Sequence, residues 1–166
     1  MSSNGFAPIA NSDARILILG TLPGKVSLAR GEYYAQRRNA FWPIMEELFD
    51  IPAAGPYGER TRQLMQSGIA LWDVCASASR AGSLDAKIIL KSVVTNNFAA
   101  FFPAHPNIRL ICFNGATAER LYLRLVQPML PNSAQNIAGL RLPSTSPAHA
   151  IASGKKLQAW RTAIRE

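Results

Sequence analysis

The sequence has few of the side chains that bind metal ions. Its 166 residues include only two cysteines and two histidines, and no Cys-x-x-Cys pair occurs. Zinc and iron–sulfur sites need three or four such ligands at short spacing, so we expect no metal site. Cys75 and Cys112 lie in apolar runs, where a small thiol packs well in a protein core.

The chain also lacks long apolar stretches and has little acidic charge. No apolar run reaches membrane-spanning length, and the first 14 residues lack the basic-then-apolar pattern of a signal peptide. We therefore expect a cytoplasmic protein with no membrane partner. Acidic residues number 10 against 18 lysines and arginines, a formal charge of +8. The basic residues are dispersed, which favours a folded basic face and a polyanionic partner, although charge alone also fits a basic protein without one.

Apolar runs of strand length recur along the chain and alternate with helical patterns. The runs are Ile16–Leu19, Ile69–Val74, Ile108–Phe113 and Ile137–Leu142. Apolar residues at three-to-four spacing predict helices in Trp42–Phe49, Arg60–Met65, Ala116–Val126 and Leu157–Ile164. Such alternation indicates a parallel sheet covered on both faces. We predict one domain, residues 1–166, with a three-layer α/β/α fold and a short, mostly parallel four-stranded sheet.

Two loops that follow predicted strands carry the features of a ligand site. Gly20–Gly24 (GTLPG) has glycine on either side of a proline, so its backbone can turn tightly and approach a ligand. It has neither the Gly-Lys-Ser/Thr of a phosphate-binding loop nor a GxGxxG pattern. Leu142–Ala150 (LPSTSPAHA) offers hydroxyls that suit a phosphate oxygen, and ordinary turn chemistry explains them equally well. Because ligands bind outside the carboxyl ends of parallel strands, we expect both loops at one site.

Aromatic and amide side chains gather before the first long helix. Tyr34 and Phe41 flank Arg38 and Asn39, and rings beside amide and guanidinium groups can stack a flat heterocycle and read its edge. The alternative is structural, with the rings in the core and Asn39 capping the helix. Asn114, at the end of the third strand, has the same two uses: pairing with a base edge or capping the next helix.

The order of these blocks resembles the hypoxanthine-DNA (deoxyinosine) glycosylase branch of the uracil-DNA glycosylase superfamily. The blocks are GTLPGKVSL, YYAQRRNAFW, GIALWDVCASASRAGSLDAKI, FNGATA and LPSTSPAHA, and the similarity extends from about Ile16 to Trp160. The resemblance implies the three-layer fold and the excision of a deaminated base from DNA without metal or cofactor. The base would be flipped out of the duplex first. No lysine is placed for a Schiff base, so we expect a monofunctional enzyme, with Lys25, Lys87, Lys91, Lys155 and Lys156 at the surface or on phosphates.

Two departures from the superfamily pattern change the expected chemistry. Leu22 stands where the best-known members have an acidic or amide residue that positions water, and Leu142 stands where they have His or Asn. Both departures argue against ordinary uracil excision. The hypoxanthine branch implies catalysis by Asn39, which would orient water toward C1′. It gives Asn114 a catalytic or base-contacting role.

The remaining site residues follow from the same comparison. We expect base contacts from Gly20, Thr21, Pro23, Gly24, Tyr34 and Phe41, and DNA contacts from Arg38, Ser144, Ser146 and His149. Asp73 at a strand end could be a general base, or it could equally anchor a loop by accepting backbone hydrogen bonds. We assign Asp73, Arg80 and Asp85 a structural role, with a helix starting at Ser83–Asp85. The expected partner is DNA that contains a deaminated base, most simply hypoxanthine, bound by a monomer. The alternatives are a glycosylase for uracil, xanthine or a mismatched pyrimidine, and a nucleic-acid-binding domain without catalysis.

Overall fold

The fold is organised around a four-stranded parallel sheet. The computed structural model describes residues 2–164. The strand order is β3-β2-β6-β7, and each neighbouring pair is parallel. The strands are β2 (Ile16–Gly20), β3 (Ile69–Asp73), β6 (Leu110–Asn114) and β7 (Ala138–Leu142). Each of the four predicted runs is a strand, with its ends displaced by one or two residues at most.

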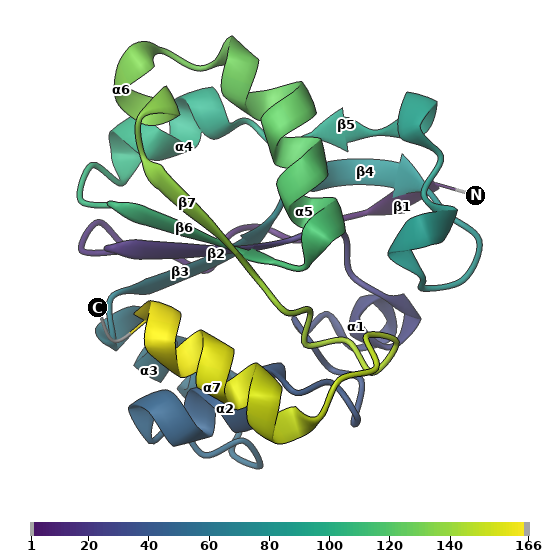
Figure 1. Ribbon diagram of the computed structural model, residues 1–166, viewed down its shortest axis with the longest axis vertical. Helices are drawn as coiled ribbons and strands as arrows, with labels where there is room; N and C mark the ends of the chain where they lie inside the picture. Colours follow the sequence, from purple (N-terminus) through teal and green to yellow (C-terminus); the bar gives the residue numbers. More distant parts are fainter. Residues whose placement is uncertain (1, 165–166) are drawn as a thin grey trace.

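Helices cover both faces of this sheet (Figure 1). One face carries α4 (Phe98–Ala104), α5 (Ala116–Leu121) with a wider turn over Tyr122–Val126, and α6 (Asn132–Gln135). The other carries α2 (Phe41–Phe49), α3 (Tyr57–Gln66) and α7 (Ser153–Ile164). The connections contain α1 (Lys25–Arg30) and the 3-10 turns Asp85–Lys87, Leu90–Ser92 and Gln127–Met129. The three-layer α/β/α prediction is confirmed. Within residues 2–164, no helix has both the length and the apolar character needed to cross a membrane.

The central strand β2 is buried on both sides. Leu17 and Leu19 belong to an apolar cluster under α4 and α5, whereas Ile16 and Ile18 belong to a second cluster under α2 and α7. Successive side chains of a strand point to opposite faces, so an apolar residue is needed at every position. This two-sided burial is why the strand reads as a continuous apolar run.

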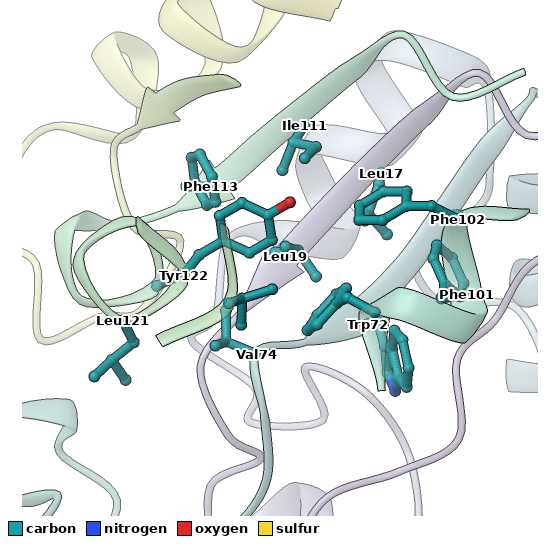
Figure 2. Close-up of a cluster of buried hydrophobic side chains, with 14 of the residues drawn as sticks. Leu17, Leu19, Trp72, Val74, Phe101, Phe102, Ile111, Phe113, Leu121 and Tyr122 are labelled. Carbon is teal, nitrogen blue, oxygen red and sulfur yellow. The ribbon is translucent and has the colours of Figure 1, made fainter. Parts of the chain in front are cut away.

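Figure 2 shows the first of these clusters, in which aromatic rings pack on the sheet. The centroid of the Trp72 ring lies 4.9 Å from the ring centroids of Phe98 and Phe101. Phe113 packs against Tyr122, with ring centroids 5.2 Å apart. Trp72 and Phe113 are the penultimate residues of β3 and β6. Their packing therefore fixes the direction of the final residue of each strand, which must point to the opposite face.

A second, antiparallel sheet lies beside the first. It consists of β1 (Ser2–Asn4), β4 (Cys75–Ser79) and β5 (Val94–Thr95), in the order β1-β4-β5. Its strands are short, and β4 is made of alternating serine or cysteine and alanine residues. These small residues are not the β-branched and aromatic residues typical of strands, so the sequence patterns do not predict this sheet.

Truncating a central side chain of β2 should test the two-sided burial. Leu17 is 0% exposed, so Leu17→Ala leaves a cavity and should lower the free energy of unfolding by about 2–5 kcal/mol. Urea unfolding followed by circular dichroism measures this loss. Leu123 is 45% exposed, and the matched Leu123→Ala change should cost less than about 0.5 kcal/mol. Equal losses in the two variants would contradict this description of the core.

Candidate active site

The last residues of the four strands form one row across the carboxyl edge of the sheet. Gly20 pairs with Asp73, and Asn114 pairs with Leu142. The strands β2 and β6 are neighbours between these two pairs. Leu19, Trp72 and Phe113, which precede the last residues of β2, β3 and β6, point into the aromatic cluster, and Leu142 packs in the cluster under α2 and α7. This row therefore faces the side covered by α2 and α7. The register thus brings together two predicted site residues, Gly20 and Asn114. It also places Asp73, the last residue of β3, beside Gly20.

Gly20 leaves space for two oxygen atoms in the middle of this row. A Cβ at position 20 would lie 2.5 Å from Oδ1 of Asp73 and 2.8 Å from Oη of Tyr34. Both separations are too short for a carbon atom, so a larger residue at position 20 would have to displace these two side chains. The carboxyl group of Asp73 and the hydroxyl group of Tyr34 therefore converge on the same small space.

Unpaired polar atoms are concentrated at this place. Among residues 2–164, six buried side-chain nitrogen or oxygen atoms have no hydrogen-bond partner, and three of them are Thr21 Oγ1, Tyr34 Oη and Asp73 Oδ2. An unsatisfied buried polar atom costs roughly 1–3 kcal/mol. The Asn114 amide lies close enough to favour ionisation of the Tyr34 hydroxyl, but not in hydrogen-bonding geometry. Of these atoms, Tyr34 Oη lies at the space beside Gly20, where Asp73 places its Oδ1, and Thr21 is the next residue along the chain. Unpaired polar atoms at the strand ends are what a polar ligand would satisfy.

Burial raises the pKa of the Asp73 carboxyl group and the pKa of the Tyr34 hydroxyl group. Desolvation, followed by the nearby charge of Asp85, raises the pKa of Asp73 to about 7, and Arg80 opposes this shift. Desolvation and then the charge of Asp73 raise the pKa of the Tyr34 hydroxyl far above its ordinary value. At neutral pH the hydroxyl is a hydrogen-bond donor, and Asp73 is divided between the protonated acid and the carboxylate.

The first loop is held from behind by the segment that follows β4. The Arg80 guanidinium donates hydrogen bonds to the carbonyl oxygens of Leu22 and Pro23, and it pairs with Asp85 at 3.4 Å. The Lys25 amide donates to the hydroxyl of Ser83 at 3.0 Å. Arg80 holds the first loop and Asp85 pairs with Arg80, which is the structural role predicted for both residues. The predicted helix start at residues 83–85 is a single 3-10 turn, Asp85–Lys87.

The hydroxyl-rich last loop is tied to the row by Asn114. The Thr145 amide donates to Oδ1 of Asn114 at 2.9 Å, and Nδ2 of Asn114 donates to the Thr145 hydroxyl at 3.0 Å. The Ala40 amide in turn donates to the Thr145 carbonyl at 2.9 Å. Asn114 therefore does not cap the next helix, whose N-cap is Gly115. One N–H of its amide remains for another acceptor.

Serine hydroxyls shape the outer part of the same loop. The Ser144 hydroxyl accepts from the Ser146 amide at 3.1 Å, and the Ser146 hydroxyl accepts from the Ala148 amide at 3.2 Å. His149 follows on the exposed end of the loop. Lys156 donates from Nζ to the Ser146 carbonyl at 2.9 Å and is 4% exposed. The expectation that Lys156 lies at the surface is therefore wrong, and burial lowers its pKa.

Asn39 and the two aromatic residues occupy different environments. Asn39 is half-buried, and its Oδ1 accepts a hydrogen bond from the Phe41 amide at 2.9 Å. The N-cap of α2 is Ala40, so Asn39 is not the cap. Phe41 is 0% exposed, and Tyr34 stacks on it with ring centroids 4.2 Å apart. Phe41 thus supports Tyr34 from the core and has no surface of its own for a base. Arg38 lies in the exposed part of this loop.

Tyr34 has an unusual backbone conformation. Its φ angle is +57°, in the left-handed region that costs a residue with a side chain roughly 1–2 kcal/mol. The loop keeps this conformation because the ring stacks on Phe41 while the hydroxyl reaches the space at Gly20. Backbone strain of this kind gathers where a side chain must be held in one position.

Two hollows of the surface lie outside the centre of the row. A groove of about 740 Å³ runs between β7 and α7, and a smaller one of about 310 Å³ lies beside α4. Leu142 lines the first groove, but Gly20, Asp73 and Asn114 line neither. Asp73 is 4% exposed, so the row is closed in this conformation. The convergence of unpaired polar atoms, and not the depth of a hollow, identifies the site.

Comparison with known proteins places the chain among DNA glycosylases. Residues 7–166 match the family model of the uracil DNA glycosylase superfamily. A hypoxanthine DNA glycosylase of Methanosarcina acetivorans is 32% identical over 170 aligned positions, which cover 99% of each chain. One from Methanosarcina barkeri is 36% identical over 117 positions, covering 69% of this chain and 72% of the relative. A solution NMR structure from Methanosarcina acetivorans, solved as a candidate uracil DNA glycosylase, superposes with a TM-score of 0.82 at 31% identity, covering 99% of this chain and 98% of that one.

The raised pKa of Asp73 predicts a specific pH dependence of stability. In the unfolded chain this carboxyl group loses its proton near its ordinary pKa of 3.8, whereas in the folded protein it keeps the proton to about pH 7. The folded state therefore binds more protons between these values, and the free energy of unfolding falls as the pH rises from about 4 to about 7. Asp73→Asn removes this fall, which is worth at most about 4 kcal/mol.

Urea unfolding of the wild type and of Asp73→Asn at pH 5 and pH 8 measures the difference. Asp50 is exposed and has a left-handed backbone that asparagine tolerates, so Asp50→Asn is the matched control. It should keep the wild-type pH dependence. If Asp73→Asn kept it too, the carboxyl group would titrate normally in the folded protein.

Proposed function

The chain belongs to the uracil DNA glycosylase superfamily, and on that premise we propose that it hydrolyses the N-glycosidic bond of deoxyinosine in DNA and releases hypoxanthine. Two relatives named hypoxanthine DNA glycosylase support this substrate. The observation that carries the proposal is the row at the strand ends, where Thr21, Tyr34 and Asp73 each have an unpaired buried polar atom and the Tyr34 hydroxyl and Asp73 carboxyl group meet beside Gly20. Hypoxanthine has both donors and acceptors on its edges and would satisfy them.

The two buried leucines argue for hypoxanthine over uracil. Leu22 is 7% exposed and packs in the α4/α5 cluster, and Leu142 is 4% exposed in the other cluster. Neither can position water or stabilise an anion. The stabilisation of the transition state must therefore come from other groups of the site. A good leaving group needs less of it, and hypoxanthine is a better leaving group than adenine.

Asn39 is the proposed group that orients water toward C1′. Its Oδ1 accepts one hydrogen bond, from the Phe41 amide, and a carbonyl oxygen can accept a second, here from water. The bond to Phe41 fixes the amide plane at the start of α2. The sugar becomes oxocarbenium-like as the base leaves, so a water held in place on one side stabilises the transition state.

Tyr34 and Asn114 are proposed to contact the flipped base. The Tyr34 ring is half-buried, is backed by Phe41 and can stack on a heterocycle. The remaining N–H of Asn114 points toward the row and can donate to the base. Because the row is closed, we infer that the Tyr34 side chain moves aside when the base enters. The backbone amides of the first loop, Thr21 to Gly24, complete the base contacts.

The DNA backbone is proposed to contact the exposed loops at this edge. Ser144 and Ser146 offer hydroxyls to phosphate oxygens, and His149 and Arg38 lie on the exposed parts of the adjoining loops. Phosphate contacts position DNA without reading sequence, and they offset the few kcal/mol that base flipping costs. Every residue of the site comes from one chain, so a monomer is sufficient.

A glycosylase assay tests the activity itself. Duplexes with a single hypoxanthine, uracil or xanthine are incubated with the protein and then treated with alkali, which cleaves abasic sites. We expect release of hypoxanthine in preference to uracil, and strand cleavage only after alkali. Tight binding of the hypoxanthine duplex without release of any base would show a binding domain and not an enzyme.

Replacing Asn39 tests the proposed water-orienting group. Asn39→Ala should slow excision of hypoxanthine by about 10²–10³-fold, the usual effect of losing one preorganised polar group. Asn39→Asp keeps an oxygen acceptor for the Phe41 amide but has no side-chain amide group. Comparing it with Asn39→Ala separates the effect of losing the hydrogen bond to Phe41 from the effect of losing the side-chain amide. Asn136 is exposed and precedes β7, at the opposite end of that strand from Leu142, and Asn136→Ala should leave the single-turnover rate unchanged. Wild-type rates in Asn39→Ala would remove Asn39 from the mechanism.

A further inference from the structure

Asp73 has the surroundings of a reactive group and not of a structural one. It is 4% exposed, and among the residues that the structure describes it is the one acidic side chain that is buried. A structural carboxylate normally accepts hydrogen bonds from backbone amides or an arginine. The nearby Arg80 instead binds the Leu22 and Pro23 carbonyls and Asp85. Oδ2 of Asp73 has no partner.

The backbone holds this unpaired carboxyl group firmly in place. The Asn96 side chain donates to the Asp73 carbonyl at 2.7 Å, and the Val74 amide donates to the Gly20 carbonyl at 2.9 Å. Trp72 is fixed by the aromatic cluster on the opposite face. The side chain is therefore directed at the space beside Gly20, where the proposed function places the base.

We propose that Asp73 is a catalytic acid, whose protonated carboxyl group transfers its proton to N7 of hypoxanthine as the glycosidic bond breaks. This role rests on the proposed function, because it assumes that a flipped purine occupies the row. N7 is the most basic ring nitrogen of a hypoxanthine nucleoside. Its protonation lets the base leave as a neutral molecule, which supplies the help that Leu22 and Leu142 cannot give.

The step is balanced without any further reactant. The proton moves from Asp73 to N7, and the C1′–N9 bond breaks with its electron pair going to the purine. Water forms the new C1′–O bond and loses a proton, which returns to the Asp73 carboxylate through solvent. Water is the co-substrate of the hydrolysis, so the enzyme ends in its starting state.

Charged and titratable groups from each adjoining element face Asp73. Tyr33 and Tyr34 approach from the loop before α2, and Cys75 follows in β4. Asp85 raises the pKa of Asp73 and Arg80 lowers it, but desolvation has the largest effect. With a pKa of about 7, a useful fraction of Asp73 carries its proton at neutral pH. This is the range in which a catalytic acid is efficient.

The pH dependence of single-turnover rates tests this role. On a deoxyinosine duplex, the wild-type rate should fall about tenfold per pH unit above a pKa near 7. Asparagine can donate a hydrogen bond but cannot release a proton. Asp73→Asn should therefore be at least about 100-fold slower at pH 6, and its rate should not fall between pH 6 and pH 9. Asp50→Asn should follow the wild type at every pH.

Two results would overturn the inference while leaving the proposed function intact. One is an Asp73→Asn rate equal to that of the wild type at pH 6, and the other is the same fall above pH 7 in both proteins. If the wild type released no hypoxanthine at any pH, the proposed function itself would fail.

A further substrate tests the role without any variant. In 7-deaza-2′-deoxyinosine a C–H group replaces N7, so the wild type should release this base at least about 100-fold more slowly than hypoxanthine. Equal release of the two bases would overturn proton transfer to N7. This measurement and the wild-type pH profile remain decisive if Asp73→Asn does not fold.

Discussion

The common register of four parallel strands is the constraint on which the rest of the molecule depends. The strands β2, β3 and β6 are buried on both faces, so their penultimate side chains, Leu19, Trp72 and Phe113, enter the aromatic cluster and their last residues point the opposite way. The fourth strand, β7, pairs in the same register, so residues from four distant parts of the sequence end in one row. A shift of one residue in β3 would turn Asp73 into the aromatic cluster and expose Trp72 to the site.

Three loops are then fastened to this row by different means. Arg80 holds the first loop through its carbonyl oxygens, Asn114 holds the last loop through Thr145, and Thr145 holds the loop before α2 through Ala40. Lys156 adds a buried contact to the last loop. The backbone around the site is thus rigid on most sides. The backbone at Tyr34 is held as well, because its neighbours Tyr33 and Ala35 donate hydrogen bonds to Tyr57 and Ser27, so only the Tyr34 side chain is left to move.

The sequence predicts the sheet and its covering helices because they depend on apolar periodicity, which is a local property. Ile16–Leu19 and Ile69–Val74 are recognisable as strands since both faces are buried. The small antiparallel sheet is not recognisable in this way, since the serine and alanine residues of β4 are not typical of strands. The sequence suggests that Phe41 contacts the base and that Lys156 lies at the surface. In the folded structure both side chains are buried, which local sequence patterns do not reveal. The sequence cannot decide whether Asp73 anchors a loop or takes part in chemistry, and only the folded structure reveals that its Oδ2 has no hydrogen-bond partner.

The missing side chain at Gly20 has a consequence for how such a site can evolve. Because a Cβ there would collide with both Asp73 and Tyr34, these three positions cannot vary independently. A larger residue at position 20 would become acceptable only after the other two side chains had shortened or withdrawn. Related enzymes with a different residue at this position should therefore also differ at the strand-end acid and at the stacking ring, so a change of substrate would require coordinated substitution of all three.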